Sequence, residues 1–301
     1  MAARFCTSSY DLFQDNPLIE PSARGVEDDS VTLDRVLQVV REERGLDFQR
    51  YRRTTVERRV GLRMLATNVG TYGEYLDFLR ENPLEMDQLI DNLTLKVSSF
   101  FREPRSLALL GGEILDEILR AKTGLQDQRV RIWSAGCARG EEPYSIAIVL
   151  HEKGLRLQKP VDFLVCATDI DRVALRDAER GRYREESLDK APPEVVANYF
   201  DTENGKKVIR EQIRARVEFM YHDLVTNAEP PLGKDVKFDV VVCRNVFIYF
   251  QQELQEQTLA LIQRALVDRG FLILGESESI LPGRNTSFEC VDRRASAYRK
   301  K

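Results

Sequence analysis

The residues most able to do chemistry lie in one short segment, WSAGCARGEEPYSIAI, which runs from Trp133 to Ile148. Two glycines, Gly136 and Gly140, are four residues apart, and two carboxylates follow them directly. An apolar run before the glycines and an amphipathic run after them predict a strand, a tight loop and a helix, an arrangement that holds nucleotide-like cofactors. A pyrophosphate at a helix N-terminus requires free backbone N–H groups and no competing anion. The carboxylates, and the lack of a G-K-[ST] triplet, therefore disfavour a dinucleotide site and a P-loop.

Glu142 in this segment and Asp169 further along favour a cofactor that carries positive charge and no phosphate. Asp169 ends the apolar run FLVCATD, so it is predicted at the carboxyl end of the next strand, where an acidic side chain can accept both ribose hydroxyls. S-adenosylmethionine has a cationic sulfonium, an ammonium and a phosphate-free adenosine, and we predict that it binds here, with a contact at Gly136. In the structural alternative the glutamates favour a helix start and Asp169 caps the helix that begins at Asp171.

Alternating strand and helix patterns predict the sheet that carries these residues. Apolar runs at 130–133, 161–167, 216–221, 236–243 and 271–274 indicate buried strands, and amphipathic patterns at 141–153, 171–180 and 252–268 indicate helices. This alternation predicts an α/β fold with a doubly wound, mostly parallel sheet, which binds ligands at the carboxyl ends of its strands.

Two further units are predicted outside this alternation. Helical patterns over 31–95 indicate a small all-helical N-terminal domain, preceded by a mobile extension at 1–30 and followed by the cofactor-binding domain at 96–301. Thr54 and Glu57 have the spacing of a capping box at the start of the second helix. The interval between Asp169 and the strand near Val217 is too long for one crossover helix, and in it Asn204-Gly205 predicts a hairpin turn.

The composition argues against several classes of protein. The chain has 301 residues, a formal net charge of −4 and no apolar run near the roughly 18 residues that a membrane span needs. Its start lacks the apolar core of a signal peptide, so we expect a cytoplasmic protein with no membrane insertion. The net negative charge gives no indication of nucleic-acid binding, so we expect no nucleic-acid partner. Five scattered cysteines and two histidines show no metal-ligand spacing, so we expect no disulfide framework and no metal site.

Five motifs in order, VSSFFREP, WSAGCARGEEPYSIA, ATDIDRVAL, VVCRNVFIYF and LILGESES, closely resemble those of the chemotaxis receptor methyltransferases, the CheR family. The resemblance covers about residues 31–300. It implies a helical N-terminal domain, a class I methyltransferase sheet and an antiparallel β-subdomain inserted at about 183–216. It also implies methyl transfer from S-adenosylmethionine to glutamates of bacterial chemoreceptors for sensory adaptation, with the receptor's cytoplasmic helical region as partner.

The resemblance also assigns roles to individual residues. Tyr249 is implied, with Arg244 and Asn245, on the methyl and substrate side. We predict that Arg102 and Tyr249 are the catalytic residues that position the substrate glutamate or the cofactor's carboxylate, because Arg offers a fork of donors and Tyr one directional donor. As alternatives, Arg102 pairs with Glu103, and Tyr249 belongs to the core. Lys96 and Arg139 depart from the family's usual residues. Cofactor contacts are implied for Ser98, Arg102, Glu142, Asp169, Asp223, Leu224, Arg244 and Asn245.

The expected reaction needs no general base. A glutamate carboxylate has a pKa near ~4.3, so it is already the nucleophile at neutral pH. A carboxylate anion and a sulfonium cation give a neutral ester and a neutral thioether, so alignment and removal of water are the main requirements. A chain with only two histidines is compatible with this chemistry.

The basic run RYRRTTVERRVGLR is the candidate for docking the partner. We predict that Arg53, Arg59 and Arg63 bind an acidic receptor helix, and a solvated charged face is the structural alternative. Some family members tether a receptor's C-terminal peptide by adding it as a strand to the β-subdomain. The hairpin at Asn204-Gly205 is short for this, so we expect the enzyme to act without the tether. Separately, we expect a monomer.

Two rival functions stay open at this point. One is a methyltransferase for nucleic acid or a small molecule, although RNVFIYF lacks the Asn/Asp-Pro-Pro-aromatic loop of amino-directed nucleic-acid enzymes. The other is a degenerate methyltransferase fold that only senses the cofactor or scaffolds a receptor array. Resistance of transferred methyl groups to mild alkali would favour the first rival, and binding without turnover would favour the second.

Overall fold

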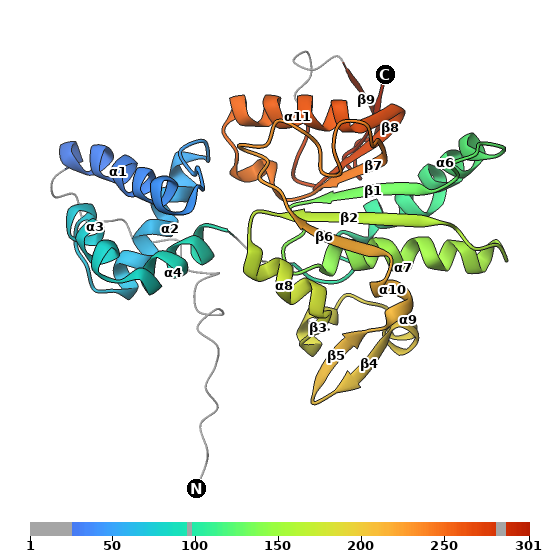
Figure 1. The fold of residues 1–301 in the computed structure, drawn as a ribbon, viewed down its shortest axis with the longest axis horizontal. Coiled ribbons are helices and arrows are strands. Elements are labelled where there is room, and N and C mark those ends of the chain that lie inside the picture. The colour runs from blue at the N-terminus through green and yellow to red at the C-terminus, as the bar shows by residue number, and fades with distance from the viewer. Residues whose placement is uncertain (1–25, 95–97, 281–286) are drawn as a thin grey trace, which may run out of the picture.

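The computed structural model describes residues 26–94, 98–280 and 287–301, and Figure 1 shows their arrangement. Its largest element is a seven-stranded sheet with the strand order β6-β2-β1-β7-β8-β10-β9. The strands from β6 to β8 run parallel, and β10 pairs antiparallel with both β8 and β9. This is the mostly parallel, doubly wound sheet that the sequence predicts. Its strands are β1 (Val130–Ala135), β2 (Phe163–Asp169), β6 (Val217–Tyr221), β7 (Phe238–Cys243), β8 (Leu266–Leu274), β9 (Phe288–Asp292) and β10 (Ala297–Lys300).

β1 lies at the centre of the parallel strands, between β2 and β7. Trp133 of β1 pairs with Cys166 of β2 on one side and with Val241 of β7 on the other. The chain winds outward from β1 to β2 and β6, and then crosses to the other side of β1 to form β7 and β8. The topological switch point therefore lies between β1 and β7, where open α/β sheets bind ligands at the carboxyl ends of their strands.

Helices cover both faces of this sheet (Figure 1). Because successive strand residues point to opposite faces, Ile132 and Trp133 belong to separate cores, one beneath α7 and one beneath α11. α11 ends earlier than the predicted 252–268, because the chain after Ala265 turns into β8 and its next apolar residues join that strand. The covering helices are α5 (Pro104–Leu109), η2 (Leu110–Ile114), α6 (Leu115–Lys122), α7 (Glu141–Arg156), α8 (Arg172–Arg180) and α11 (Gln252–Ala265).

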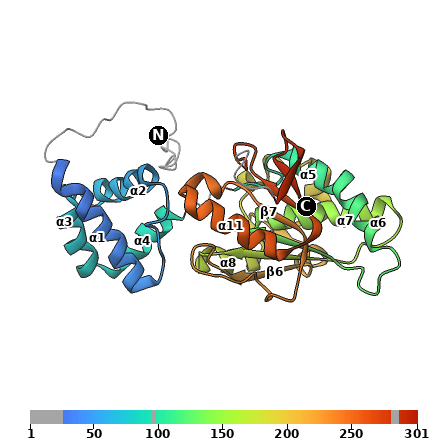
Figure 2. The same cartoon turned by 90° about the horizontal axis from the view of Figure 1, so that it is seen from above.

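Four N-terminal helices form a separate bundle beside the sheet, as both views show (Figures 1 and 2). They are α1 (Val26–Arg44), α2 (Arg53–Ala66), α3 (Tyr72–Glu81) and α4 (Pro83–Leu93). Their inward faces make an independent core that includes Val36, Val60, Tyr75 and Leu89. α1 begins inside the predicted extension at 1–30, of which residues 1–25 lie outside the described residues. The predicted domain boundaries at 95–96 and at about 183–216 stay predictions.

The capping box lies one helix later than predicted. α2 starts at Arg53 without a side-chain cap, and Glu57 accepts a hydrogen bond from Arg53 Nε instead. At the start of α3, Thr71 Oγ1 accepts the N–H of Glu74, and Glu74 Oε2 accepts the N–H of Thr71. Both pairs have the same three-residue spacing, so spacing alone does not identify the helix that carries the box.

The overlong interval between β2 and β6 forms a small separate sheet, seen at the lower edge of Figure 1. It has the order β3-β5-β4, with antiparallel pairing throughout. Asn204 and Gly205 have φ values of 50° and 72°, which a two-residue hairpin of the primed type requires, so the predicted hairpin is confirmed. The elements are β3 (Arg182–Tyr183), η3 (Glu185–Leu188), α9 (Pro193–Tyr199), β4 (Phe200–Glu203), β5 (Lys206–Ile209) and α10 (Glu211–Arg214).

Candidate functional site

A cleft lies at the carboxyl ends of β1, β2 and β7 and reaches the helical domain. It comprises two cavities of about 90 and 390 Å³, and both are lined by Gly136, Ala138, Asn245 and Tyr249. These shared walls make the cavities two halves of one cleft. We name the halves after the charged residues that line them. Asp169 and Asp223 line the smaller, acidic half, whereas Arg58, Arg59, Arg102, Arg244 and Glu142 line the larger, arginine half.

The glycine loop after β1 forms the floor between the two halves. Gly136 has a φ of 78°, a conformation that glycine adopts at little cost. The N–H groups of Gly136 and Cys137 both donate to the carbonyl oxygen of Thr168, at 2.8 and 2.9 Å. A Cβ atom at position 136 would lie 2.5 Å from Cγ2 of Val246. Because Val246 lines the acidic half, a larger residue here would push the loop or that wall out of place.

Asp169 is held beside the acidic half by backbone donors. Its Oδ2 accepts the N–H of Ala138 at 2.8 Å, and its Oδ1 accepts the N–H of Asp171 at 2.9 Å. The cap of α8 is Asp171 itself, whose carboxylate accepts the N–H groups of Val173 and Ala174. The alternative in which Asp169 caps this helix is therefore wrong. Asp169 instead lies at a lining position that can reach a bound ribose.

Asp223 and Leu224 follow β6 and also line the acidic half. Asp223 is 1% exposed, and its carboxylate accepts the N–H of Val225 at 2.8 Å and the hydroxyl of Thr226 at 2.7 Å. This carboxylate therefore shapes its own loop. The cofactor contacts predicted at these two positions depend on that loop conformation as well as on negative charge.

Glu142 is the negative residue of the arginine half. Its Oε1 accepts the hydroxyl of Ser134 at 2.8 Å, and its Oε2 lies 3.5 Å from Nη1 of Arg244. Burial raises the pKa of Glu142, and the neighbouring Arg244 and Ser134 partly offset that rise. Glu141, the other glutamate of the pair, is buried under the start of α7 and accepts a hydrogen bond from Ser98. The two glutamates therefore have different tasks, and only Glu142 lines the cleft.

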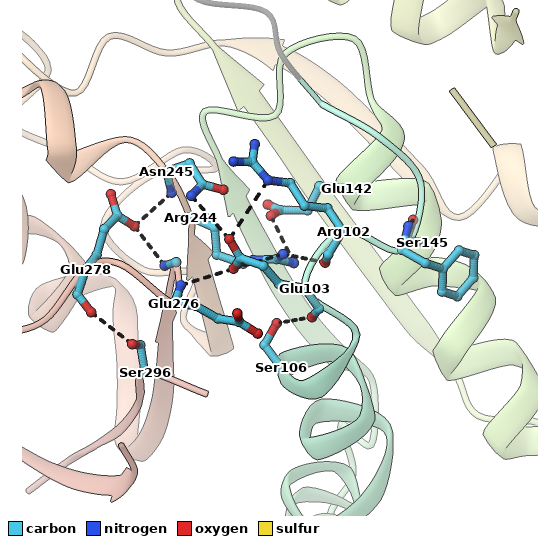
Figure 3. Close-up of polar contacts among 12 residues, drawn as sticks. Arg102, Glu103, Ser106, Glu142, Ser145, Arg244, Asn245, Glu276, Glu278 and Ser296 are labelled. Atoms are coloured by element: carbon cyan, nitrogen blue, oxygen red, sulfur yellow. Dashed lines mark hydrogen bonds and ion pairs between the residues drawn. The ribbon is translucent and has the colours of Figure 1, made fainter. Parts of the chain in front are cut away.

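Glu103 links its own segment to the loops after β7 and β8. From the sequence it was expected only as an alternative partner of Arg102. Its Oε2 accepts Nε of Arg244 at 3.2 Å and the N–H of Glu276 at 3.1 Å, and its Oε1 accepts Nδ2 of Asn245 at 3.3 Å (Figure 3). The φ of Glu103 is 53°, a left-handed conformation that costs a non-glycine residue about 1–3 kcal/mol. The ion pair with buried Arg244 keeps Glu103 in that conformation.

Arg244 is consequently a positioning residue. Its side chain is 3% exposed, and besides Glu103 and Glu142 it donates to the carbonyl oxygen of Arg102. The guanidinium thus fixes both the loop that carries Arg102 and the carboxylate of Glu142. Arg244 also lines the cleft, so its predicted contact with the cofactor stays a prediction beside this internal role.

Glu278, which the sequence analysis did not select, holds the loop after β7. Its carboxylate accepts the N–H groups of Asn245 and Gly275 at 2.7 Å and that of Ile248 at 3.1 Å. Asn245 has a φ of 59°, a left-handed conformation, and the Glu278 carboxylate accepts the backbone N–H groups of this loop. Burial raises the pKa of Glu278, and the backbone donors partly offset the rise. The motif GESES contains the residue, but nothing in its spacing indicates that its partners lie 30 residues earlier.

Ser98, Arg102 and Tyr249 all line the arginine half, and the cofactor and substrate contacts predicted for them stay predictions. Arg102 is one-third exposed, and its Nε lies 3.9 Å from Oε1 of Glu103. Burial raises the pKa of Tyr249, so its phenol remains a hydrogen-bond donor at neutral pH. The carbonyl oxygen of Tyr249 accepts the N–H of Arg52 at 2.7 Å, which ties the loop after β7 to the helical domain.

The three arginines predicted to dock a partner occupy different environments. Arg59 lines the cleft next to Arg58. Arg53 is partly exposed and pairs with Asp34 and Glu57. Arg63 binds the buried Glu85 through two hydrogen bonds of 2.9 and 2.7 Å and also reaches Gln88. The docking role predicted for Arg63 stays a prediction, and in this structure its guanidinium is engaged inside the helical domain.

The charges of the cleft fit S-adenosylmethionine. The acidic half places Asp169 and Asp223 where hydroxyl and amino groups of a nucleoside can donate, and these carboxylates would repel a phosphate. The arginine half offers both signs of charge, Glu142 for an ammonium and Arg102 for a carboxylate, as the amino-acid end of this cofactor requires. The residues present thus match a phosphate-free nucleoside with a zwitterionic tail.

Comparison with known proteins agrees with this geometry. The SAM-binding domain model of CheR methyltransferases matches residues 96–297, and the all-alpha domain model of the same family matches residues 32–94. The chain belongs to the CheR methyltransferase family. It is 31% identical to a chemotaxis protein methyltransferase of Listeria innocua, over 81% of this chain and 88% of that protein. Its identity with a chemotaxis protein methyltransferase of Borreliella burgdorferi is 27%, over 85% and 90% of the two chains.

Two other matches are more distant or partial. The chain is 31% identical to an uncharacterised 104.1 kDa protein of Rhodobacter capsulatus, over 88% of this chain but only 29% of that protein's length. Among solved structures, PKMT2 from Rickettsia typhi in complex with AdoHcy matches over 60% of this chain and 26% of the PKMT2 chain, with 14% identity and a TM-score of 0.34. Assignment to the CheR family rests on the two domain models and not on this structural overlap.

Two features are absent from the part of the chain that the structure describes. No helix there has the length and apolar character that crossing a membrane requires. No three or more His, Cys, Asp or Glu side chains are grouped there in a way that could hold a metal ion. The predicted cytoplasmic location and the predicted lack of a metal stay predictions, and Lys96 lies outside the described residues.

Proposed function

We propose that the chain is an S-adenosylmethionine-dependent protein-glutamate O-methyltransferase that acts on bacterial chemoreceptors. The observation that carries the proposal is the division of the cleft into an acidic half and an arginine half within a CheR family fold. The first half suits an adenosine, and the second suits an amino-acid tail together with an incoming carboxylate. Relatives named chemotaxis protein methyltransferases support the receptor as substrate.

In this proposal each side of the cofactor has its own residues. Asp169 accepts the ribose hydroxyls, and the loop of Asp223 and Leu224 borders the adenine. Glu142 accepts the ammonium, and Arg102 donates to the carboxylate. Gly136 and Ser98 complete the wall without adding charge. These assignments follow the lining positions of the side chains.

When bound, the cofactor supplies an electrophilic methyl group on a sulfonium. The protein's residues then hold the substrate carboxylate in line and keep water away from it. Tyr249 can donate one hydrogen bond to that carboxylate, because a tyrosine phenol is protonated at neutral pH and burial raises its pKa further. No residue has to remove a proton, because the glutamate is ionised at neutral pH.

The substrate enters, we propose, from the side of α2. Arg58 and Arg59 of this helix line the arginine half, and burying a glutamate beside them offsets its loss of hydration. A receptor's methylation region that is helical and rich in glutamate suits this basic surface. The enzyme is proposed to act as a monomer in the cytoplasm, without a nucleic-acid partner.

The experiment incubates the protein with S-adenosylmethionine labelled on its methyl group and a membrane fraction rich in chemoreceptors. We expect label in a receptor-sized band and its release as methanol in mild alkali, because a glutamyl methyl ester hydrolyses there. A receptor whose methylated glutamates are replaced by alanine is the matched control and should stay unlabelled. Alkali-resistant label, or label in nucleic acid instead of protein, would overturn the proposal.

A further inference from the structure

The cofactor cleft is not made by the catalytic domain alone. Three residues of the N-terminal segment line its acidic half, namely Tyr51 from the loop between α1 and α2, and Leu93 and Thr94 from the end of α4. Asp169, Asp223 and Phe250 of the catalytic domain line the same half. An adenosine in this half would therefore lie between two domains that have separate cores.

We propose that Tyr51 is a cofactor-binding residue, and that the helical domain thereby supplies one wall of the adenosine site. This inference rests on the proposed cofactor. It gives the helical domain a second role, in addition to the proposed docking of the partner. A nucleoside has an aromatic face, and an aromatic side chain on the wall of its site is the most effective apolar partner for that face.

The ring of Tyr51 is held by other aromatic rings. It lies edge-on to Phe250 at 5.2 Å and to Phe48 at 5.1 Å between ring centroids. Phe48 is buried in the core of the helical domain, and Phe250 is buried in the core beneath α11. Tyr51 is thus packed between the two cores with its position fixed from both sides, as a preorganised binding wall requires.

Backbone hydrogen bonds reinforce this position. The N–H of Arg52 donates to the carbonyl oxygen of Tyr249, and the N–H of Gln251 donates to that of Arg50, at 2.7 and 3.0 Å. The side-chain amide of Gln251 donates to the carbonyl oxygens of Gln49 and Tyr51. These bonds form a short antiparallel bridge between Tyr51 and Phe250 across the domain boundary. A second contact places Thr94 Oγ1 3.3 Å from Oδ2 of Asp171.

The electrostatic surroundings of Tyr51 agree with this role. Burial, followed by the negative charges of Asp223 and Asp169, raises the pKa of Tyr51. The phenol is therefore neutral and lies within the field of the two carboxylates that line the acidic half. A cofactor that donates to these carboxylates must occupy the space that Tyr51 borders.

The test measures the Kd of the product S-adenosylhomocysteine by calorimetry on the full chain. Tyr51→Leu keeps apolar volume against Phe48 and Phe250 but removes the aromatic face, and Tyr51→Phe keeps that face. We expect a Kd about tenfold higher for Tyr51→Leu, equivalent to about 1.4 kcal/mol, and a change below about threefold for Tyr51→Phe. In wild type, the ligand should also slow amide hydrogen exchange at residues 48–52.

The matched control is Tyr72→Leu, because Tyr72 is also half-buried against the core of the helical domain but does not line the cleft. The Tyr72→Leu variant should bind S-adenosylhomocysteine with the same Kd as the wild type. Equal losses for Tyr51→Leu and Tyr72→Leu, wild-type affinity of Tyr51→Leu, or protection confined to the catalytic domain would each overturn the inference. A wild-type chain that does not bind the product at all would instead refute the proposed function.

Discussion

At the scale of single residues, the cleft contains side chains that we propose to bind the cofactor and other side chains that hold these in place. Arg102 and Glu142 lie in motifs of the CheR family, and the resemblance selected both as candidates that line the cleft. Glu103 and Glu278 were missed, because they act through contacts with residues 141 and 30 positions away in the chain. Such contacts depend on how the strands assemble, and the spacing of residues within one motif does not predict them.

Replacement of Glu142 tests the proposed ammonium site through its pH dependence. Burial raises the pKa of Glu142, so in wild type its carboxyl takes up a proton at a higher pH than an ordinary glutamate. The ionised form binds an ammonium, so product affinity should fall as pH falls through this raised pKa. Glu142→Gln should bind about tenfold or more weakly at pH 7 and lose that pH dependence, as calorimetry from pH 5 to 8 would reveal. An unchanged pH profile in the variant would exclude Glu142 from the site.

Arg102 offers a second test at this scale. Arg102→Lys keeps the positive charge but loses the planar fork, and Arg102→Ala loses both. We expect kcat/KM to fall by about tenfold for lysine and about a hundredfold for alanine, in line with a hydrogen bond to a charged group. Steady-state rates with a receptor fragment provide the measurement. Wild-type rates for the alanine variant would show that Arg102 serves only as a loop residue.

At the scale of elements, patterns predicted the existence of strands and helices better than their ends. The five predicted strands are all present, and β1, β2, β7 and β8 are largely buried, as continuous apolar runs in a parallel sheet predict. The prediction of a buried strand at 216–221 is wrong in its burial, because β6 lies at the edge of the sheet and only Val217 of it is buried. α11 ends at Ala265 although the apolar pattern continues, since Leu266 and Val267 enter a strand. The capping box was assigned to Thr54 instead of Thr71, because only the tertiary structure decides which of two equal spacings starts a helix.

Arg63 on α2 should matter for stability and not for docking. Its partner Glu85 is 5% exposed, so Arg63→Ala would leave a buried carboxylate with only the Tyr75 hydroxyl and lower the free energy of unfolding by about 3–5 kcal/mol. Arg53→Ala, which removes only surface pairs, should cost less than about 1 kcal/mol. Urea denaturation of both variants measures the difference. A stable Arg63→Ala variant with weakened receptor binding would restore the docking role.

The hairpin of β4 and β5 is expected to bind no receptor peptide. β4 is an edge strand of four residues, and three of them, Asp201, Thr202 and Glu203, are exposed. Charged, short edges resist strand addition. Titration with an aromatic-containing peptide from a receptor's C-terminus should therefore give no micromolar binding. Saturable binding at that strength, lost on replacing Thr202 by proline, would contradict this expectation.

At the scale of the whole molecule, the two domains were predictable but their joint site was not. Composition and periodicity separate a helical bundle from an α/β domain, whereas the bridge between Tyr51 and Phe250 joins segments 199 residues apart. The cleft consequently combines an acidic half lined by residues of both domains with arginines from α2 and from the loops before α5 and after β7. The proposed cofactor site and the proposed docking surface thus adjoin each other.

The central claim is that this cleft accepts a phosphate-free nucleoside with a zwitterionic tail and rejects phosphorylated ones. Calorimetric titration of the purified chain with S-adenosylhomocysteine, NAD and ATP at low ionic strength tests it most directly. The account predicts micromolar or tighter binding of S-adenosylhomocysteine, and binding of NAD and ATP weaker by about a hundredfold or more. Tight association with NAD or ATP, together with no binding of S-adenosylhomocysteine, would contradict it.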